Sequence, residues 1–321
     1  MKVLMFGRGV IATIYGWVLA QAGHEVEFYV RPGRAATYGE TVGLDLIDSR
    51  RKVRGERVVE SWPVRYREEL EPDHDFDLIV LSVAHYRLAD AAAFLAPRLS
   101  DATVLFFSNI WSEPMTAIGA IPVDRVAWGF PQAGGGFGPD GVLRGNLLPS
   151  VVFGTVDRPA TERALAVRQA FREAGLRIKE ETDFRGWLWI HFVSDAGFFS
   201  QAVRVGPMAN LVGASGDLRQ VVLTGRELLP LLEARGVDLR RHRVGVLQFR
   251  APAWLVGSLL AVATRHLALA RVNFEAHSDP AAREPREICR DTLAEARRLD
   301  IEVPRLEAAE PHFARDDTPR R

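Results

Sequence analysis

Three small residues near the start of the chain have the spacing of a dinucleotide-binding loop. Gly7, Gly9 and Ala12 form the pattern G-x-G-x-x-A directly after the apolar run Val3–Phe6. The first glycine permits a tight turn, the second lets a pyrophosphate approach the backbone, and the small third residue lets the next helix pack close to the strand. The free N–H groups at the start of that helix attract phosphate. The residues expected to bind the cofactor here are Gly7, Arg8, Gly9, Val10, Ile11 and Ala12. The alternative is a structural turn that binds no ligand.

The residue that follows the second apolar run indicates which dinucleotide is preferred. His24–Val30 predicts a second strand, and this strand ends at Arg31. A carboxylate at this place binds the ribose hydroxyls of NAD, whereas an arginine accommodates the 2′-phosphate of NADP. Arg31, with Arg34 nearby, therefore favours NADP(H).

Two further strand ends carry candidate cofactor-binding residues. Phe76–Val83 and Thr103–Phe107 are apolar runs typical of buried parallel strands, and ligands bind beyond the carboxyl ends of such strands. We expect the amide of Asn109 to hold the nicotinamide ribose or the substrate, the alternative being a turn after the strand. His85 is expected near the adenine or ribose, the alternative being an exposed loop histidine. The cofactor-binding residues predicted at these two strand ends are Val83, Ala84, His85 and Asn109.

The elements that position these residues alternate between strand and helix up to about residue 181. Further strands are expected at Arg125–Gly129 and Leu176–Glu180, the latter at a sheet edge, and helices at Leu88–Leu99 and Thr161–Ala174, with Thr161 as the cap of the second helix. The glycine-rich stretch Ala133–Gly141 indicates a turn or loop. Val142–Leu148 and Ser150–Thr155 are expected to pair as antiparallel strands around Pro149.

Beyond Asp183 the strand signals fade. The segments that indicate helices are Phe184–Gln201, Ser215–Arg235, Ala253–Ala270 and Pro285–Leu299. The predicted fold class is therefore α/β, with an N-terminal doubly wound, Rossmann-type domain over residues 1–181 and an all-helical C-terminal domain over residues 182–321. The tail from Pro311 to Arg321 is polar and expected to fray.

Composition limits the classes of partner. The 321 residues contain 41 Lys plus Arg and 41 Asp plus Glu, and this balance argues against nucleic acid or a membrane surface as a partner. The single cysteine, Cys289, excludes an internal disulfide and favours a cytoplasmic location. The N-terminal apolar residues belong to the first strand and helix, so we expect no signal peptide. The apolar run Trp254–Thr264 is shorter than the roughly 18–20 residues of a membrane span. The oligomeric state stays open, a homodimer through the helical domain being one option.

With these residues in place, the chain resembles the ketopantoate reductase (2-dehydropantoate 2-reductase) family over nearly its whole length. The glycine loop, Arg31, the strand that leads to Asn109 and the closing segment RDTLAEARRLDIEVP all match the family plan. The resemblance implies reduction of an α-keto acid by NADPH, with the cofactor lying between the two domains.

The chain departs from the family at the substrate side. The family's catalytic lysine and the asparagine one turn later fall at His191 and Asp195, and no lysine follows Lys179. The family's substrate-binding glutamate falls at Glu284, with Glu287 as the rival. The resemblance therefore implies a divergent member that acts on a substrate other than ketopantoate.

His191 and Asp195 form a plausible acid pair in their own right. Residues spaced i, i+4 lie on one face of a helix, and an imidazole is a serviceable proton donor at neutral pH. The aspartate would fix the tautomer of the imidazole. The alternative is a polar helix residue with a nearby carboxylate and no catalytic role. Glu284 likewise has an alternative role, since acidic residues are common in the first turn of helices.

Three hypotheses of function follow. The leading one is an NADPH-dependent reductase of a small-molecule carbonyl or imine, with His191 as the acid. The second keeps the fold but assigns a non-redox reaction, catalysed by a cyclase, lyase or isomerase. The third is a non-enzymatic NADP(H)-binding protein. The aromatic residues around His191, among them Trp187, favour a bulkier and less charged substrate than a small keto acid.

Overall fold

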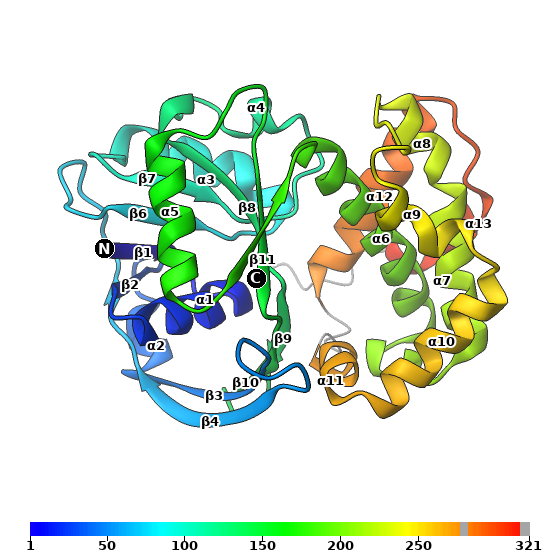
Figure 1. Ribbon diagram of the computed structural model, residues 1–321, viewed down its shortest axis with the longest axis horizontal. Helices are drawn as coiled ribbons and strands as arrows, with labels where there is room; N and C mark the ends of the chain where they lie inside the picture. The colour runs from blue at the N-terminus through cyan, green and yellow to red at the C-terminus, as the bar shows by residue number, and fades with distance from the viewer. Residues whose placement is uncertain (277–281, 315–321) are drawn as a thin grey trace. The chain divides into compact units, whose positions relative to one another are not determined.

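The computed structural model describes residues 1–276 and 282–314, and Figure 1 shows its elements. The chain divides into two compact units, Met1–Phe184 and Arg185–Arg321. Among the described residues, the strands lie in the first unit, whereas the second consists of helices and their connections.

The first unit is built on an eight-stranded sheet with the order β12-β11-β8-β7-β6-β1-β2-β5. Its strands are β1 (Lys2–Phe6), β2 (Glu25–Tyr29), β5 (Tyr66–Arg67), β6 (Leu78–Leu81), β7 (Thr103–Phe106), β8 (Val126–Phe130), β11 (Ser150–Gly154) and β12 (Arg177–Glu181). The six strands from β5 to β8 in this order are parallel, and β11 runs antiparallel to β8. The chain leaves β1 toward β2 and later returns on the other side as β6, so the topological switch point lies beside β1. The predicted α/β fold class is confirmed.

Helices cover both faces of this sheet because successive residues of a strand point to opposite faces. Met5 belongs to one core cluster with Tyr15 and Phe171, which come from α1 (Val10–Gln21) and α5 (Glu162–Glu173). Phe6 points to the other face, where its ring centroid lies 5.7 Å from that of Phe94 in α3 (Leu88–Leu95). Thr161 caps α5 as predicted, since its hydroxyl accepts the N–H of Ala164.

The remaining short helical elements connect the strands. They are α2 (Ala35–Tyr38), α4 (Pro114–Ala117), η1 (His85–Arg87), η2 (Ala96–Arg98) and η3 (Val123–Arg125).

A second, four-stranded sheet has the order β4-β3-β10-β9. Its strands are β3 (Thr41–Asp48), β4 (Glu56–Pro63), β9 (Ala133–Phe137) and β10 (Leu143–Leu147). The prediction of a loop over Ala133–Gly141 is therefore wrong for its first part. Glycine here serves close pairing of strands, because a Cβ on Gly145 would lie 2.3 Å from the carbonyl oxygen of Gly134.

The predicted pairing of Val142–Leu148 with Ser150–Thr155 is also wrong. β10 pairs with β9 and β3, whereas β11 pairs with β8 and β12 in the main sheet. The chain passes from one sheet to the other at Pro149, which lacks the N–H that a continuing strand pair would use.

The second unit is helical. Its elements are α6 (Phe184–Val205), η4 (Met208–Leu211), α7 (Ser215–Glu227), α8 (Leu229–Ala234), α9 (Arg243–Arg250), α10 (Ala253–His266), α11 (Ala268–Ala276), α12 (Arg283–Arg298) and α13 (Pro304–Phe313). The single helix predicted over Ser215–Arg235 is broken at Leu228, because a new helix begins at Leu229 with Pro230 in its first turn. The helix predicted over Ala253–Ala270 is broken at Leu267.

Two remaining expectations concern the end of the chain and membranes. Of the tail that was expected to fray, Pro311–Phe313 belong to α13, and residues 315–321 lie outside the described residues. No single helix of the described residues is long and apolar enough to cross a membrane, and α9 and α10 reach such a length only as a pair bent by 104° at the break between them.

Candidate cofactor and catalytic sites

The parallel sheet brings the predicted cofactor residues of the first unit to one edge. Phe6 is in register with Tyr29 on one side and with Leu81 on the other, and Leu81 is in register with Phe106. The four strands β2, β1, β6 and β7 therefore end side by side. The segments that follow them are the glycine loop, Arg31–Arg34, Val83–His85 and Asn109. In this sheet they share the carboxyl edge, where such folds bind ligands.

The glycine loop is open above its backbone. Gly7 has a φ of +98°, and a Cβ placed on Gly7 or Gly9 meets no atom of the described chain within 4 Å. The N–H of Gly7 donates to the carbonyl oxygen of Tyr29 at 2.9 Å and so fixes the loop to the end of β2. Ala12 is fully buried, as a close contact between helix and strand requires.

The start of α1 suits an anion. Gly9 is its N-cap, no side chain caps the helix, and its first turn contains no acidic residue. The hydroxyl of Thr13 donates back to the carbonyl oxygen of Gly9 at 2.9 Å, which fixes the turn from within. A phosphate at this position would accept N–H groups of the first turn and meet the positive end of the helix dipole. The loop and the helix start therefore fit the pyrophosphate of a dinucleotide.

Arg8 extends from this loop into a ring of aromatic side chains. Its Nε donates to the hydroxyl of Tyr66 at 2.8 Å. Its guanidinium carbon lies 4.8 Å from the ring centroid of Tyr38 and 4.6 Å from that of Phe137. These contacts hold a half-buried cation in one orientation beside the phosphate loop.

The loop after β2 carries exposed arginines and one carboxylate that the sequence did not reveal. Arg31 and Arg34 are exposed, and the guanidinium carbon of Arg34 lies 5.4 Å from the ring centroid of Tyr38. Glu68 accepts the N–H of Ala35 at 2.7 Å. The N–H groups of Ala35, Gly33 and Arg34 lower the pKa of Glu68, so this carboxylate stays ionised. Nothing in the sequence links Glu68 to this loop, because it arrives there through the pairing of β5 with β2.

The two remaining strand ends place their residues as the topology requires. Val83–His85 follow β6, and His85 begins the turn η1 with its ring perpendicular to that of Tyr86. Asn109 is partly buried and lies three residues beyond β7. The hydroxyl of Ser108 donates to the carbonyl oxygen of Leu81 at 3.1 Å and ties the two strand ends together.

The candidate acid pair lies on α6 of the second unit. The Nε2 atom of His191 lies 3.5 Å from the Oδ2 atom of Asp195. One turn before it, the indole of Trp187 stacks on the imidazole with a centroid distance of 5.5 Å and an interplanar angle of 8°. The side chain of His191 is 36% exposed and that of Asp195 is 23% exposed, so the imidazole can reach a ligand while a carboxylate and a ring hold it.

Helix α12 packs against α6 near this pair. The thiol of Cys289 donates to the carbonyl oxygen of Ala196 at 3.8 Å. Burial raises the pKa of Cys289, and the charge of Asp195 adds to this effect, which places the thiol in the field of the acid pair. Glu284 is partly buried in the first turn of α12. Its rival Glu287 forms ion pairs with Arg283 and Arg290, which gives that carboxylate a structural role.

The other aromatic residues of α6 are largely core. Trp189 and Phe192 are buried, and Phe198 packs edge-on against Phe274 of α11. Trp187 is therefore the aromatic side chain of α6 that lies directly on the candidate acid.

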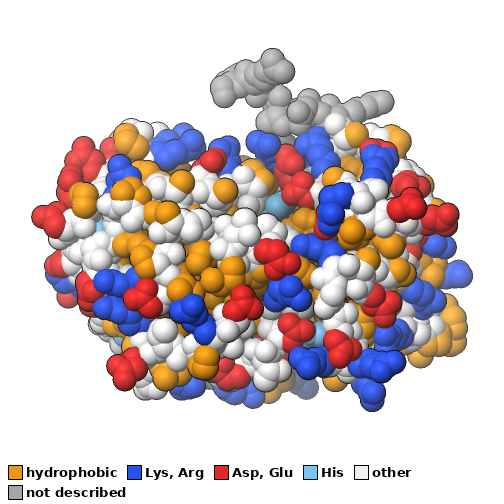
Figure 2. All heavy atoms as spheres, turned by 90° about the horizontal axis from the view of Figure 1, so that it is seen from above, with side chains coloured by type: hydrophobic (Ala, Val, Ile, Leu, Met, Phe, Trp, Pro, Cys, Tyr) orange, Lys and Arg blue, Asp and Glu red, His pale blue; other side chains and the backbone are white. Residues whose placement is uncertain are grey.

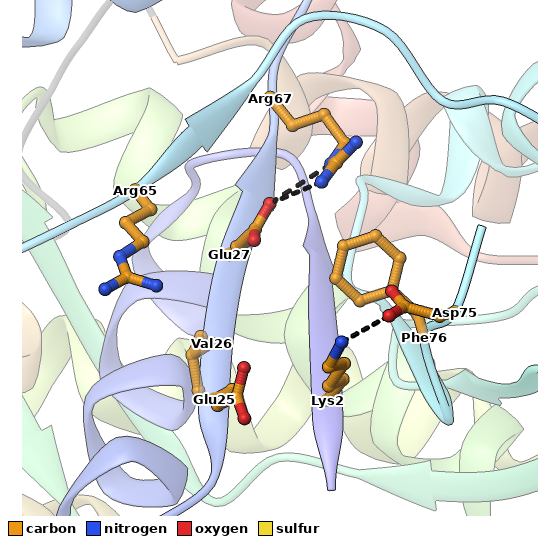
Figure 3. Close-up of a pocket in the computed structure, with 8 residues that line it drawn as sticks. All are labelled: Lys2, Glu25, Val26, Glu27, Arg65, Arg67, Asp75 and Phe76. Atoms are coloured by element: carbon orange, nitrogen blue, oxygen red, sulfur yellow. Dashed lines mark hydrogen bonds and ion pairs between the residues drawn. The ribbon is translucent and has the colours of Figure 1, made fainter.

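A separate charged hollow lies at the amino end of the main sheet (Figure 3). Lys2 forms an ion pair with Asp75, and Arg67 forms one with Glu27 at 3.1 Å. Lys2 begins β1, whereas Gly7 follows its end, so about 16 Å of strand separates this hollow from the glycine loop. The sequence reasoning did not predict this hollow, and it contains none of the predicted site residues.

The fold and the glycine loop place the first unit in the Rossmann-type α/β class. A helical unit follows it in the chain. Residues 3–157 match the model of the family described as ketopantoate reductase PanE/ApbA. Over these residues, the match confirms the resemblance to the ketopantoate reductase family that the sequence predicted.

Solved structures with the same fold extend over the whole chain. A D-mandelate dehydrogenase in complex with NADH and anilino(oxo)acetate has 14% identity and a TM-score of 0.72, with 98% of this chain and 97% of that chain covered. The 2-dehydropantoate 2-reductase from Geobacter metallireducens GS-15 has 16% identity and a TM-score of 0.67, with 98% and 99% covered. The PanE/ApbA family ketopantoate reductase from Ralstonia eutropha JMP134 has 20% identity and a TM-score of 0.64, with 98% and 97% covered. A comparison with curated protein sequences finds no match.

Proposed function

We propose that the protein is a nicotinamide-dependent reductase of a small carbonyl or imine compound. The observation that carries this proposal is the open glycine loop at the uncapped start of α1, on the carboxyl edge of the sheet. The family match and the NADH bound by the structurally similar D-mandelate dehydrogenase support the same cofactor class.

We further propose that NADP(H) is preferred over NAD(H). Arg31 follows the second strand, at the place where NAD-dependent sites have a carboxylate. In the same loop, the guanidinium group of Arg34 lies beside the ring of Tyr38. Arg8 adds a third cation held by Tyr66. Three guanidinium groups near one loop favour a dianionic 2′-phosphate over two ribose hydroxyls. Glu68 opposes them in part, because its carboxylate binds the backbone N–H groups of the same loop.

For the chemical step, we assign the proton donor to His191. When bound, a reduced nicotinamide would supply a hydride to the carbonyl or imine carbon, and the heteroatom would then need a proton from the protein. The imidazole is exposed enough to donate it, and Asp195 at 3.5 Å would hold the ring in the orientation that this donation needs. Trp187 presents an aromatic surface beside this acid, which favours a substrate with an apolar group. The anilino(oxo)acetate in the similar D-mandelate dehydrogenase is such a molecule.

The first experiment is a calorimetric titration of the purified protein with NADPH and with NADH. We expect tighter binding of NADPH by about 10- to 100-fold, the factor that charge-assisted hydrogen bonds to one phosphate provide. Arg31→Ala should remove most of this preference, while Arg172→Ala, an exposed arginine on α5, should leave it unchanged. Binding of neither nucleotide would overturn the proposal.

A second measurement separates redox from non-redox chemistry. With a panel of aromatic and aliphatic 2-keto acids and imines, a reductase consumes one NADPH for each product molecule. Product formation without net loss of NADPH would instead indicate a cyclase, lyase or isomerase reaction. Tight nucleotide binding with no product from any compound would favour a binding protein.

A further inference from the structure

The loop after β2 is bound by a carboxylate that comes from a distant part of the chain. Residues 31–38 contain two arginines and no acidic residue. Glu68, which follows β5 directly, accepts the N–H of Ala35 at 2.7 Å. The tertiary fold therefore gives this loop the acidic side chain that its own sequence lacks.

Backbone pairing brings Glu68 to this place. Tyr29 at the end of β2 is in register with Arg67, and the N–H of Val30 donates to the carbonyl oxygen of Arg67 at 2.8 Å. Glu68 and Arg31 are the next residues on the two paired segments. Rossmann-type sites that prefer NAD bind its ribose hydroxyls with a carboxylate at the end of the second strand. In this chain Arg31 follows that strand, and the strand order supplies a carboxylate to the same loop.

The segment around β5 also supports a neighbouring cation. The hydroxyl of Tyr66, two residues before Glu68, accepts the Nε–H of Arg8 at 2.8 Å. Arg8, Arg31 and Arg34 are the cations near this loop, whereas Glu68 is the carboxylate bound to its backbone. The balance between these charges determines how well the loop receives a dianionic group.

We propose that Glu68 is a specificity-determining residue of the cofactor site, whose carboxylate binds the ribose hydroxyls of NAD(H) and opposes the 2′-phosphate of NADP(H). This inference rests on the proposed function. An ionised carboxylate has about four acceptor positions, so it can accept hydroxyl groups while it keeps the N–H of Ala35. The arginines favour NADP(H), and Glu68 reduces their effect, so the site accepts both nucleotides.

A 2′-phosphate is disfavoured by Glu68 for two reasons. Its negative charges are repelled by the carboxylate, and repulsion between charges about 4 Å apart is appreciable even in water. It also competes for the backbone N–H groups of the loop, because phosphate and carboxylate both accept charge-assisted hydrogen bonds from such groups. These N–H groups lower the pKa of Glu68, so the carboxylate is ionised at neutral pH.

The alternative is a structural role in which Glu68 only fixes the loop. The two roles predict opposite results for one nucleotide. Loss of a structural contact would weaken the binding of NADPH and NADH alike. Loss of a specificity-determining carboxylate would strengthen the binding of NADPH and weaken that of NADH.

The experiment is a calorimetric titration of Glu68→Gln and of the wild type with NADPH and with NADH. Glutamine keeps an oxygen that accepts the N–H of Ala35 but carries no charge. We expect Glu68→Gln to bind NADPH about 5- to 10-fold more tightly and NADH about 3- to 10-fold more weakly. The gain for NADPH should shrink when NaCl is raised from about 20 to about 500 mM, because salt screens the repulsion.

Glu69→Gln is the matched control. Glu69 is the next residue and is exposed, so the substitution changes the net charge of the protein by the same amount. It should leave both affinities within about twofold of the wild type. A shift in Glu69→Gln as large as that in Glu68→Gln would assign the effect to net charge and overturn the proposal.

Hydrogen exchange without nucleotide tests the contact itself. The amide of Ala35 should exchange faster in Glu68→Ala than in the wild type, because its acceptor has been removed. Equal exchange in the two proteins would show that the carboxylate does not hold this N–H, and would overturn the proposal.

The outcomes separate this inference from the proposed function. Binding of neither nucleotide by the wild type overturns both. Binding of both nucleotides, with a ratio of affinities that Glu68→Gln leaves unchanged, overturns only the role of Glu68. Weaker binding of both nucleotides by Glu68→Gln in equal measure would likewise leave Glu68 with a structural role alone.

Discussion

The imidazole of His191 is held on two sides by residues one helical turn away. Trp187 covers a ring face, and Asp195 approaches Nε2 from the next turn. The stacked ring limits rotation of the imidazole, and the carboxylate 3.5 Å from Nε2 holds that nitrogen in place. This arrangement suits a proton donor whose orientation must be kept between turnovers.

Replacement of His191 by asparagine should lower kcat by about 10²- to 10⁴-fold, the usual contribution of a positioned acid. The affinity for NADPH should stay within about twofold, because the residues proposed to bind the nucleotide lie in the glycine loop and the Arg31–Arg34 segment. Steady-state kinetics and titration of the same sample provide both values. Asp195→Asn should cause a smaller loss of kcat, since an amide holds the imidazole less firmly than the carboxylate does.

His312→Asn is the matched control, because His312 is exposed on α13 in the same unit. Its kinetics should equal those of the wild type. Full activity of His191→Asn would exclude the assigned role and leave the histidine as a polar helix residue.

For individual residues, the sequence predicts which side chains are neighbours on one helix. It does not predict which side chains become neighbours through the pairing of distant strands. The i, i+4 rule places Asp195 beside His191, and the distance of 3.5 Å agrees with it. The partners of Arg8 and of the Arg31–Arg34 loop are different. Tyr66 and Glu68 reach them only because β5 pairs with β2, a contact between distant segments that no local pattern encodes.

The closing helix of the chain depends on a carboxylate from another element. Glu227 at the end of α7 accepts the N–H of Leu306 at 2.8 Å and that of Arg305 at 3.1 Å, both at the start of α13. Its side chain is 10% exposed, and burial raises the pKa of Glu227 against the opposing effect of these N–H groups. The cap therefore binds α13 to α7 while the carboxylate resists ionisation.

The pKa of Glu227 gives a pH-dependent prediction. A raised folded-state pKa means that this group contributes less stability as the pH rises from its ordinary pKa of 4.5 through the folded-state value. Glu227→Gln keeps one acceptor oxygen without the charge, so its stability relative to the wild type should rise over this range. Glu227→Ala removes the cap and should cost about 1–2 kcal/mol at pH 4.5 and less at pH 7.5, because the contribution of the wild-type carboxyl falls over this range.

Chemical denaturation at pH 4.5 and at pH 7.5 measures these differences. Glu233→Gln, at an exposed position of α8, is the control and should show no change between the two pH values. A Glu227→Gln variant that loses stability relative to the wild type as the pH rises would contradict the cause assigned here.

Elements are predictable from the sequence where one local pattern decides them. The apolar runs indicate β1, β6 and β7, and Thr161 indicates the start of α5. No local pattern of this kind indicates the strands of the second sheet. Its glycine-rich strand β9 has the composition of a loop, and β10 finds its partner β3 almost a hundred residues earlier in the chain. Strand pairing at that separation depends on the tertiary fold rather than on local propensity.

At the scale of the whole molecule, charge is balanced overall and differs between the two ends of the main sheet. Figure 2 shows acidic and basic side chains interspersed over the face in view, and the chain contains equal numbers of both signs. At the amino end of the sheet, Lys2 and Arg67 are matched by Asp75 and Glu27 (Figure 3). At the carboxyl end, α1 begins with no side-chain cap and no acidic residue in its first turn, which suits an anion.

This difference predicts where a bound nucleotide slows hydrogen exchange. With NADPH at about 100 times its dissociation constant, amides of the glycine loop and of Arg31–Ala35 should exchange up to ~100-fold more slowly, because they open only when the ligand leaves. The exposed turn at Asp73–Asp75, beside the charged hollow, should exchange at its original rate. Mass spectrometry of peptides with and without NADPH measures both regions in one sample.

Gly9→Val is the matched control for this experiment. The backbone of Gly9 has a φ of −80°, which valine tolerates, and its Cβ would meet no atom of the described residues within 4 Å. The variant should therefore fold, yet its side chain would fill the space that the pyrophosphate needs, and protection by NADPH should disappear. Protection of Asp73–Asp75 instead, or unchanged protection in Gly9→Val, would place the nucleotide away from the carboxyl edge and remove the basis of the proposed reductase.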